Sequence, residues 1–360
     1  MKIYDTMISD QYCLSWSGLD GVREFITNAL DSDHEFQWSY NGDVLSIITI
    51  DFTLKYKYLM MGVSENRNNK DSVGRHGEGS LVSMGVLLRE GYGITVYTGD
   101  KVWTPKFIYS EETEVNQLAI VESDWDTPDG NFRVDISNVD EGMLEKIKER
   151  CLYMQDDIGE TIDTDLGRVL KDRQGTLFVG GIWVQDTGLK YGYDFPPSGL
   201  PLNRDRQSVN GWDLGRATSN LWKISKQPKL LAQMLDEGDE DVSYLEYNML
   251  GLDKEIISEV ELLYNDKYQG KRLADDFNQQ QEQISKGYEG VCTTGNSAFN
   301  SVARLAPSYG SKSNIVHVNT PLEELHSLLS LVESEYTLNE TIDALRILVG
   351  DFEARGVKWK

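Results

Sequence analysis

The chain has 360 residues with 59 acidic and 35 basic side chains, so its formal net charge at pH 7 is −24. At roughly 100–200 residues per domain, this length predicts two domains or three. The 18 Tyr, 10 Phe and 8 Trp residues supply enough apolar surface for a hydrophobic core, which argues against a disordered chain. Because a chain this acidic has no general attraction for phosphate backbones, direct DNA binding is not favoured.

The cysteines and the amino-terminal residues indicate a reducing compartment. The chain has 3 cysteines, which cannot form a complete disulfide framework, and none stands in a CxxC pair. The first residues, MKIYDTMISD, contain acids and lack the apolar core of a signal peptide. The most continuous apolar stretch, 81–88, is much shorter than a membrane span. We therefore expect a cytoplasmic protein without membrane contact.

The first part of the chain predicts two helices separated by a strand. Residues 17–31 carry apolar side chains at helical spacing, and Ser17 can cap them. Residues 44–51 are rich in β-branched side chains and predict a strand that ends in an aspartate. A glycine-punctuated stretch, 72–80, then leads into a second expected helix at 81–90.

From residue 93 onward the pattern favours consecutive strands. Residues 93–109 predict a hairpin that turns at Gly99-Asp100. This run of strands predicts an antiparallel meander and argues against an alternating βαβ fold. Further elements are expected as strands at 117–122, 131–136 and 176–184 and as a helix at 140–153.

Beyond about residue 213 the sequence becomes mainly helical. The acidic run 236–241 and the Gly, Ser, Thr and Asn-rich stretch 287–313 are expected to be loops, the first of them solvated. We therefore predict a first domain over 1–212 and a mainly helical second domain over 213–360. The helices of the second part are expected at 214–235, 245–268 and 320–355.

Three polar residues on the first helix form a candidate catalytic group. Glu24, Asn28 and Asp31 are spaced i, i+4 and i+7, so they project from one helical face. A carboxylate and an amide four residues apart can hold a divalent metal with its waters, and the carboxylate can accept a proton. Taken alone, three such residues are more often a solvated helix face.

A glycine-rich segment before the second helix is a candidate anion site. Its glycines would let backbone N–H groups approach an anion, and the helix N-terminus adds positive partial charge. No GK[ST] follows the segment, which excludes a Walker loop. The dinucleotide fingerprint requires a strand directly before the glycines, and this segment has none. A flexible surface loop is the alternative. The segment comprises Gly74, Arg75, His76, Gly77, Glu78, Gly79 and Ser80.

Two positions on strands complete the set of candidates. Asp51, at the end of its strand, could accept a hydrogen bond from an exocyclic amine if it lay in a pocket, although an acid there more often terminates a strand. Gly175-Thr176 opens the expected strand 176–184 and carries little information by itself.

In this order the four elements resemble those of the GHKL superfamily of ATPases, which includes gyrase B, the ninety-kilodalton heat-shock chaperones, histidine kinases, MutL and the MORC proteins. Glu24-Phe-Ile-Thr-Asn28-Ala-Leu-Asp31-Ser32 is similar to the N-box of that family. The resemblance covers residues 15–185. It implies a Bergerat-type two-layer sandwich, an α+β fold in which a mixed, mostly antiparallel sheet carries helices on one face.

The resemblance also implies a role for each matching residue. Glu24 would orient or deprotonate the attacking water, and Asn28 would ligate Mg²⁺. Asp31 would support the nucleotide pocket. Asp51 would bind adenine, with Thr176 of the late Gly-Thr strand nearby.

The lid and the phosphate contacts are implied in the same way. Gly74–Ser80 is similar to the family's GxxGxG lid over the phosphates, and Gly62-Val63-Ser64 to the G-x-S that precedes the lid in MORC-like members. Gyrase B and MutL place a basic residue from a following domain against the γ-phosphate, and here Arg204 or Arg206 stands in the connection after the Gly-Thr strand. An Arg–Asp cluster that fixes this loop is the alternative. Arg75 in the lid is a further phosphate candidate.

One departure from the family pattern concerns the adenine side of the pocket. The family continues D-x-G-x-G after the aspartate, whereas Asp51-Phe52-Thr53-Leu54 contains no glycine. A β-branched Thr53 in place of the first glycine would narrow or reshape this side, so adenine binding is expected to be weaker than phosphate and Mg²⁺ binding.

The expected function is Mg²⁺-dependent ATP binding and slow hydrolysis, coupled to a conformational change or to a nucleotide-dependent homodimer. No helical hairpin with a phosphoacceptor histidine precedes the region, which argues against a histidine kinase. A stand-alone protein of a phage or mobile element fits best. Two alternatives stay open: a non-hydrolysing interaction protein on the same fold, and an acidic decoy that binds a basic host protein through its negative surface.

Overall fold

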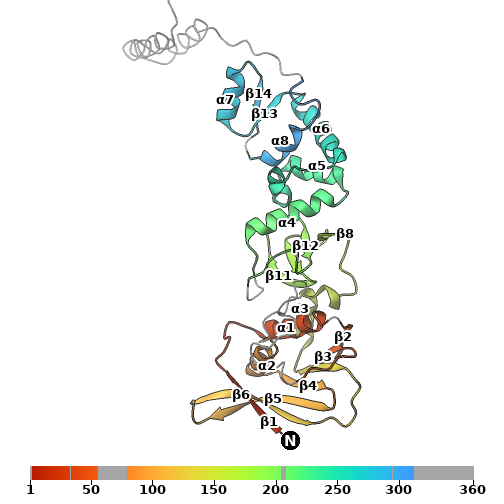
Figure 1. The fold of residues 1–360 in the computed structure, drawn as a ribbon, viewed down its shortest axis with the longest axis vertical. Helices are drawn as coiled ribbons and strands as arrows, with labels where there is room; N and C mark the ends of the chain where they lie inside the picture. Colours follow the sequence, from red (N-terminus) through yellow and green to blue (C-terminus); the bar gives the residue numbers. More distant parts are fainter. Residues whose placement is uncertain (1, 33, 56–78, 204–207, 294, 312–360) are drawn as a thin grey trace, which may run out of the picture. The chain divides into compact units, whose positions relative to one another are not determined.

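The computed structural model describes residues 2–32, 34–55, 79–203, 208–293 and 295–311 (Figure 1). Its contacts separate two compact units, one of residues 1–227 with 239–248 and one of 228–238 with 249–360. The sequence suggested the ranges 1–212 and 213–360; the packing instead joins the segments just after residue 212 to the first unit.

The first unit begins with a seven-stranded sheet in which every neighbouring pair is antiparallel. The expected meander is present as three consecutive strands, and the next strand returns to the other side of the first of them. The α+β class expected from the sequence is confirmed. In spatial order the strands are β1 (Lys2–Ser9), β6 (Val115–Asp124), β5 (Lys101–Ser110), β4 (Gly93–Thr98), β7 (Phe132–Ser137), β3 (Val44–Thr49) and β2 (Phe36–Asn41).

Three helices, α1 (Gly18–Leu30), α2 (Gly79–Arg89) and α3 (Glu141–Glu149), lie on one face of this sheet (Figure 1). The alternation of buried and partly exposed residues along the central strands explains why, because successive strand side chains point to opposite faces. The inward residues form one apolar core with the helices. Among its fully enclosed members are Leu45, Ile47, Leu118, Ile120, Val134 and Ile136.

A second sheet follows, made of five short strands. The expected single strand at 176–184 is wrong, because the chain turns back at Gly180 and Gly181, whose φ angles are 60° and 75°. Two consecutive positive φ angles are the requirement of a type I′ hairpin, and glycine meets it without strain. The strands, in spatial order, are β11 (Ile182–Asp186), β10 (Thr176–Val179), β12 (Gly192–Phe195), β9 (Gly167–Leu170) and β8 (Thr161–Thr164). The short helix η2 (Leu152–Met154) precedes them.

The helix predicted over 214–235 is two helices, α4 (Gly211–Ile224) and α5 (Pro228–Glu237). The Ser225 hydroxyl donates to the Trp222 carbonyl at 2.7 Å, and Lys226 adopts a φ of 56°, so the first helix ends there. Pro228 then starts the second, where a missing N–H costs nothing. In the first unit α4 packs against the 3₁₀ segment η3 (Glu240–Tyr247).

The expectation that 236–241 is a solvated loop is wrong in part, because its first residues end α5, its last residues begin η3, and one of its acids is buried. Asp241 is fully buried, and its carboxylate accepts hydrogen bonds from the backbone N–H groups of Lys190 and Tyr191 at 2.8 and 3.2 Å. The Tyr193 hydroxyl donates to the same carboxylate. A run of acids predicts a solvent-exposed segment. Here the hydrogen-bond donors, which lie about 50 residues away in the sequence, offset the cost of burying the Asp241 charge.

The second unit contains, after α5, the helix α6 (Lys254–Tyr268) and a small parallel βαβ arrangement. The prediction of a loop over 287–313 is wrong for part of this range, which holds a strand and a helix. The strand is β14 (Gly290–Cys292) and the helix is α8 (Ser297–Ala303); β14 forms the βαβ arrangement with β13 (Arg272–Ala274) and α7 (Phe277–Ser285). The helix expected over 245–268 begins only at Lys254, after the Asp253 cap, and the one expected over 320–355 lies outside the described residues.

No helix in the described ranges is both long enough and apolar enough to cross a membrane.

Candidate functional site

The candidate site is built on the antiparallel pair α1 and α2. At one end the Gly18 N–H donates to the Glu90 carboxylate at 2.6 Å. One turn later, a Cβ on Gly21 would lie 2.9 Å from the Leu87 side chain, so the two helices approach closely only because residue 21 lacks a side chain. The start of α1 is also fixed, since Asp20 accepts from the Ser17 N–H at 2.9 Å in the manner of a capping box.

At the other end of the pair, two of the candidate residues meet the N-terminus of α2. Glu24 is only 5% exposed, and a Cβ on Gly79 would lie 1.8 Å from its Oε1 atom. The carboxylate therefore abuts the backbone where α2 begins, in space that a side chain would fill. Beside it, Asn28 Nδ2 donates to Ser80 Oγ at 3.2 Å. Four of the predicted residues, from two separate motifs, are thus brought together.

Arg89 fixes the chain that leads into α1. Its guanidinium donates to four backbone carbonyls, those of Asp10 at 3.2 Å, Tyr12 at 2.9 Å, Cys13 at 3.1 Å and Trp16 at 3.3 Å. A planar group with five donors suits this task. The last residues of α2 therefore determine where α1 starts, and with it the position of Glu24.

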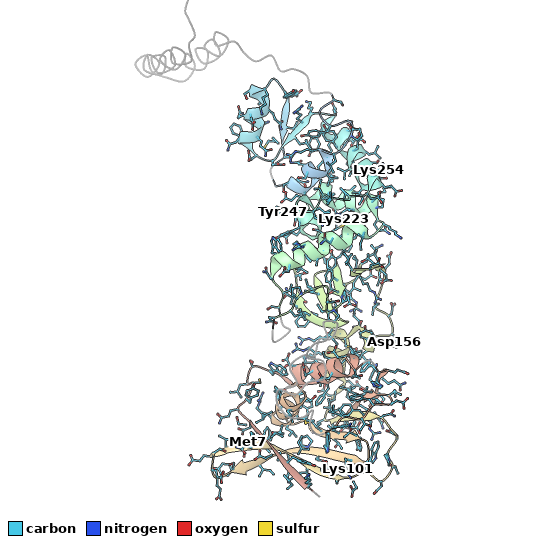
Figure 2. The ribbon with its side chains drawn as sticks, in the orientation of Figure 1. Met7, Lys101, Asp156, Lys223, Tyr247 and Lys254 are labelled. Carbon is cyan, nitrogen blue, oxygen red and sulfur yellow. The ribbon has the colours of Figure 1, made fainter. Side chains whose placement is uncertain are left out.

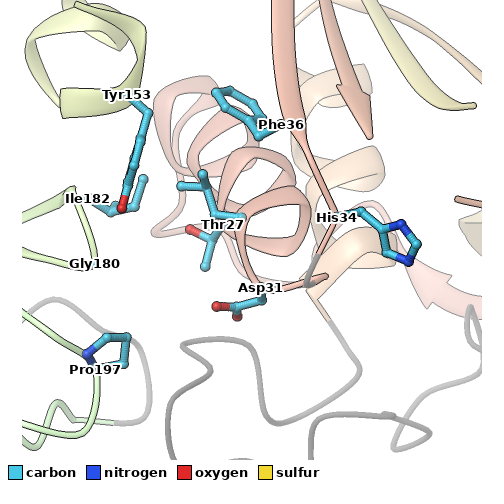
Figure 3. Close-up of a pocket in the computed structure, with 9 residues that line it drawn as sticks. Thr27, Asp31, His34, Phe36, Tyr153, Gly180, Ile182 and Pro197 are labelled. Atoms are coloured by element: carbon cyan, nitrogen blue, oxygen red, sulfur yellow. The ribbon is translucent and has the colours of Figure 1, made fainter. Parts of the chain in front are cut away.

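Asp31, the third residue of the expected helical face, lies at the C-cap of α1 and lines a cavity of about 430 Å³. Figure 3 shows Thr27 and Asp31 on the α1 side of this cavity and Gly180 and Pro197 opposite. The remaining lining residues are Leu30, His34, Phe36, Tyr153 and Ile182. The cavity thus lies between α1 and the turn of the β10–β11 hairpin.

Two acid groups near this cavity have raised pKa values. Burial raises the pKa of the Tyr153 phenol, with the Asp194 charge as a second cause. Burial likewise raises the pKa of the Asp194 carboxyl, although the Gly181 N–H, which donates to it at 2.8 Å, acts in the opposite direction.

Asp51 is exposed and lies just beyond the end of β3, with a φ of 51°. Its backbone N–H donates to Asn131 Oδ1 at 3.0 Å. The next residue, Phe52, contacts the His34 ring with a centroid separation of 5.2 Å. A Cβ on Gly99 would lie 3.2 Å from the Thr53 methyl group. Thr53, which stands where the GHKL pattern has a glycine, therefore packs against the β4–β5 turn.

Thr176 opens β10 in the five-stranded sheet, whereas Asp51 follows a strand of the seven-stranded sheet. The Thr176 hydroxyl donates to the Arg173 carbonyl at 2.8 Å. The residue that the structure does bring to Asp51 is Asn131, which follows Gly130 and precedes β7. Our sequence reasoning missed it; the signal was a second glycine-led strand, Gly130-Asn131-Phe132, directly after the meander.

The remaining candidates lie outside the described residues: Gly62, Gly74, Arg75, His76, Gly77, Glu78, Arg204 and Arg206.

Within the described ranges, no cluster of three or more His, Cys, Asp or Glu side chains is arranged to hold a metal ion.

Comparison with protein-family models gave no match, and a search of curated proteins gave none. The resemblance to the GHKL superfamily thus rests on the residues quoted above.

Proposed function

We propose that this protein binds ATP with Mg²⁺ and hydrolyses it slowly, and that turnover drives a conformational change or dimerisation. The observation that carries the proposal is the placement of a buried carboxylate, Glu24, against Gly79 at the N-terminus of α2. An amide, Asn28, lies one helical turn further along the same helix. A helix N-terminus attracts phosphate oxygens, and a carboxylate beside it is suitably placed to accept a proton from water.

The residues present fit the proposed ligands at the phosphate end. The missing Cβ at Gly79 lets the Glu24 carboxylate approach the start of α2, and Asn28 uses Nδ2 toward Ser80, which leaves Oδ1 as the atom suited to a hard cation. Bound Mg²⁺ would neutralise charge on the phosphates. In this proposal Glu24 holds the water and takes its proton, Asn28 positions the cation, and Ser80 with the first N–H groups of α2 orients the phosphates.

On the base side, Asp51 and Asn131 would share recognition. Because Asn131 Oδ1 already accepts from the Asp51 N–H, its Nδ2 group is the one directed to a ligand, while the Asp51 carboxylate accepts from an exocyclic amine. Asp51 is exposed, so these hydrogen bonds would compete with water and contribute little affinity. The proposal therefore includes weak base recognition and an affinity dominated by the phosphates.

The exposure of Asp51 and the packing of Thr53 favour a second candidate, a non-hydrolysing interaction protein on the same fold. The two candidates differ in what Glu24 does, so this residue separates them.

Phosphate release by the wild type and by Glu24→Gln is the direct test. We expect the substitution to reduce the rate at least about 100-fold, since general-base catalysis contributes that much. Calorimetric affinity for a non-hydrolysable ATP analogue with Mg²⁺ should change less than about threefold. Glu145→Gln, on the exposed side of α3, is the matched control and should behave as wild type.

Equal phosphate release by wild type and Glu24→Gln would contradict the enzyme and favour the second candidate. No heat on adding millimolar analogue, with or without Mg²⁺, would contradict nucleotide binding and would likewise favour the second candidate. Sedimentation with and without the analogue then decides whether nucleotide produces a homodimer.

A further inference from the structure

A row of three aromatic side chains lies on α4 and η3, with its two outer rings exposed and its central ring half-buried. Trp212 and Tyr244 meet edge to face with ring centroids 6.4 Å apart, and Tyr244 and Tyr247 follow at 5.8 Å. Trp212 is 49% exposed and Tyr247 is 73% exposed. We call these three residues the aromatic ladder; Tyr247 is labelled in Figure 2. Exposed aromatic side chains that gather in one place are candidates for an interaction surface.

The central ring of the ladder, Tyr244, packs against α4. A Cβ on Gly215 would lie 2.4 Å from the Tyr244 ring, so the ring packs directly on the backbone of α4. The segment that carries Tyr244 and Tyr247 is fixed by the buried Asp241 carboxylate and by Leu245, which is fully buried. Rings that are already fixed lose little conformational entropy when a partner binds, and this is a property of interface anchors.

The charged groups around the ladder show which kind of ligand it suits. The Arg216 guanidinium lies 4.7 Å from the Trp212 ring centroid, so the ladder already stacks one cation from its own chain. Next to the most exposed ring is Glu246, whose hydrogen bond is the first cause that raises the pKa of the Tyr247 phenol. An aromatic face with an adjoining carboxylate attracts ammonium and guanidinium groups in two ways, by cation–π stacking on the ring and by charge-assisted hydrogen bonds to the carboxylate.

We propose that the aromatic ladder docks a basic segment of a partner protein, with lysine or arginine side chains stacked on Tyr247 and Trp212 and facing Glu246. The overall charge of −24 favours approach of such a segment and opposes that of nucleic acid. The inference is independent of the proposed ATPase activity, because it uses neither α1 nor α2.

The test measures binding of a fluorescently labelled nine-residue peptide of alternating arginine and serine to the full chain, by anisotropy at 50, 150 and 300 mM salt. We expect Tyr247→Ser to weaken binding about threefold and the double variant Trp212→Ala/Tyr247→Ser about tenfold, as stacked cations at exposed sites contribute. Tyr247→Phe keeps the ring and should bind as wild type.

The matched control is Tyr109→Ser, which removes another exposed ring, 60% exposed, from β5. Unchanged binding by this variant, together with the losses at the ladder, supports the proposal. Losses at Tyr109→Ser equal to those at Tyr247→Ser would show attraction to the acidic surface as a whole and overturn it. Absence of binding at millimolar peptide, or tighter binding of a nine-nucleotide single strand that Tyr247→Ser abolishes, would overturn it as well.

Discussion

The α1–α2 pair and the α4–η3 layer each bury a carboxylate, but they surround it in different ways. Asp241 in η3 is fully buried among fixed donors: two backbone N–H groups and the Tyr193 hydroxyl, which itself accepts from Trp222 Nε1 at 2.7 Å. Glu24 in α1 is 5% exposed and is placed against a glycine at the start of another helix. Both are acids in an apolar setting.

The difference teaches how to separate a structural acid from a candidate catalytic one. Asp241 joins three segments, β12, α4 and η3, and any movement of its carboxylate would leave buried donors without an acceptor. Glu24 lies against Gly79 at the N-terminus of α2, where only glycine leaves room for its carboxylate. The Asn28 amide lies beside it. Burial is common to both, so the identity of the neighbours carries the functional argument.

The largest effect should come from breaking the structural acid. Asp241→Ala leaves buried donors unpaired, and we expect a loss of about 3–5 kcal/mol in the free energy of unfolding, measured by urea denaturation of the full chain. Asp239→Ala is the control, because its ion pair with Lys190 at 2.8 Å is partly exposed and contributes about 1 kcal/mol or less. Similar losses for the two variants would mean that Asp241 is not the group that fixes η3.

The glycine beside the functional acid should give an effect of intermediate size. Gly79→Ala places a Cβ 1.8 Å from Glu24 Oε1, so the carboxylate must move. We expect about 1–3 kcal/mol of destabilisation, as overpacking typically produces, and loss of ATP turnover.

Another glycine of the same helix sharpens this prediction. A Cβ on Gly85 would have its nearest neighbour, the Ile8 side chain, at 4.0 Å, an ordinary contact. Gly85→Ala should therefore stabilise the protein by up to about 1 kcal/mol through helix propensity. Thermal melts of both variants check the opposite signs, and two changes of the same sign would refute the steric account of the site.

The sequence predicted this half of the comparison well. Helical spacing over 17–31 defined α1, the apolar run after the glycine-punctuated stretch indicated α2, and the hairpin at Gly99-Asp100 followed from its turn residues. Asn131 was missed because its contact to Asp51 joins residues 80 positions apart. Local pattern carries no information on such a pair.

The other half was predicted poorly, for a related reason. The acid run at 236–241 has the composition of a loop, and only the distant donors from 190–193 make Asp241 a core residue. The Gly180-Gly181 pair was available as a turn signal, but the apolar residues on both sides favoured one long strand. Short buried elements depend on tertiary partners more than on periodicity.

A smaller effect is expected where α2 fixes the entry to α1. Arg89→Lys replaces a fork that reaches four carbonyls with a single ammonium group, and the expected loss is about 1–2 kcal/mol. If the register of the helix pair matters for the site, ATP turnover should fall while analogue affinity changes little. Arg168→Lys, whose pair with Asp163 is exposed, serves as the control and should alter neither quantity. An unchanged turnover rate in Arg89→Lys would mean that the Arg89 hydrogen bonds do not determine the position of Glu24.

The smallest effect concerns Asp194, an acid of the second sheet. It differs from Asp241, which accepts three hydrogen bonds, and from Glu24, which lies at the N-terminus of α2. Burial raises its pKa, so the folded protein binds the proton more tightly than the unfolded chain does. Wild-type stability therefore falls as the pH rises from below the ordinary aspartate value of about 3.9 through the raised native value. Asp194→Asn keeps an acceptor for the Gly181 N–H and carries no charge, so it should melt higher than wild type at pH 7 and equally at pH 3. Asp165→Asn, in the exposed β8–β9 turn, should show no such pH-dependent gain. A lower melting temperature for Asp194→Asn at pH 7 would place this acid with Asp241, as a charge that the fold requires.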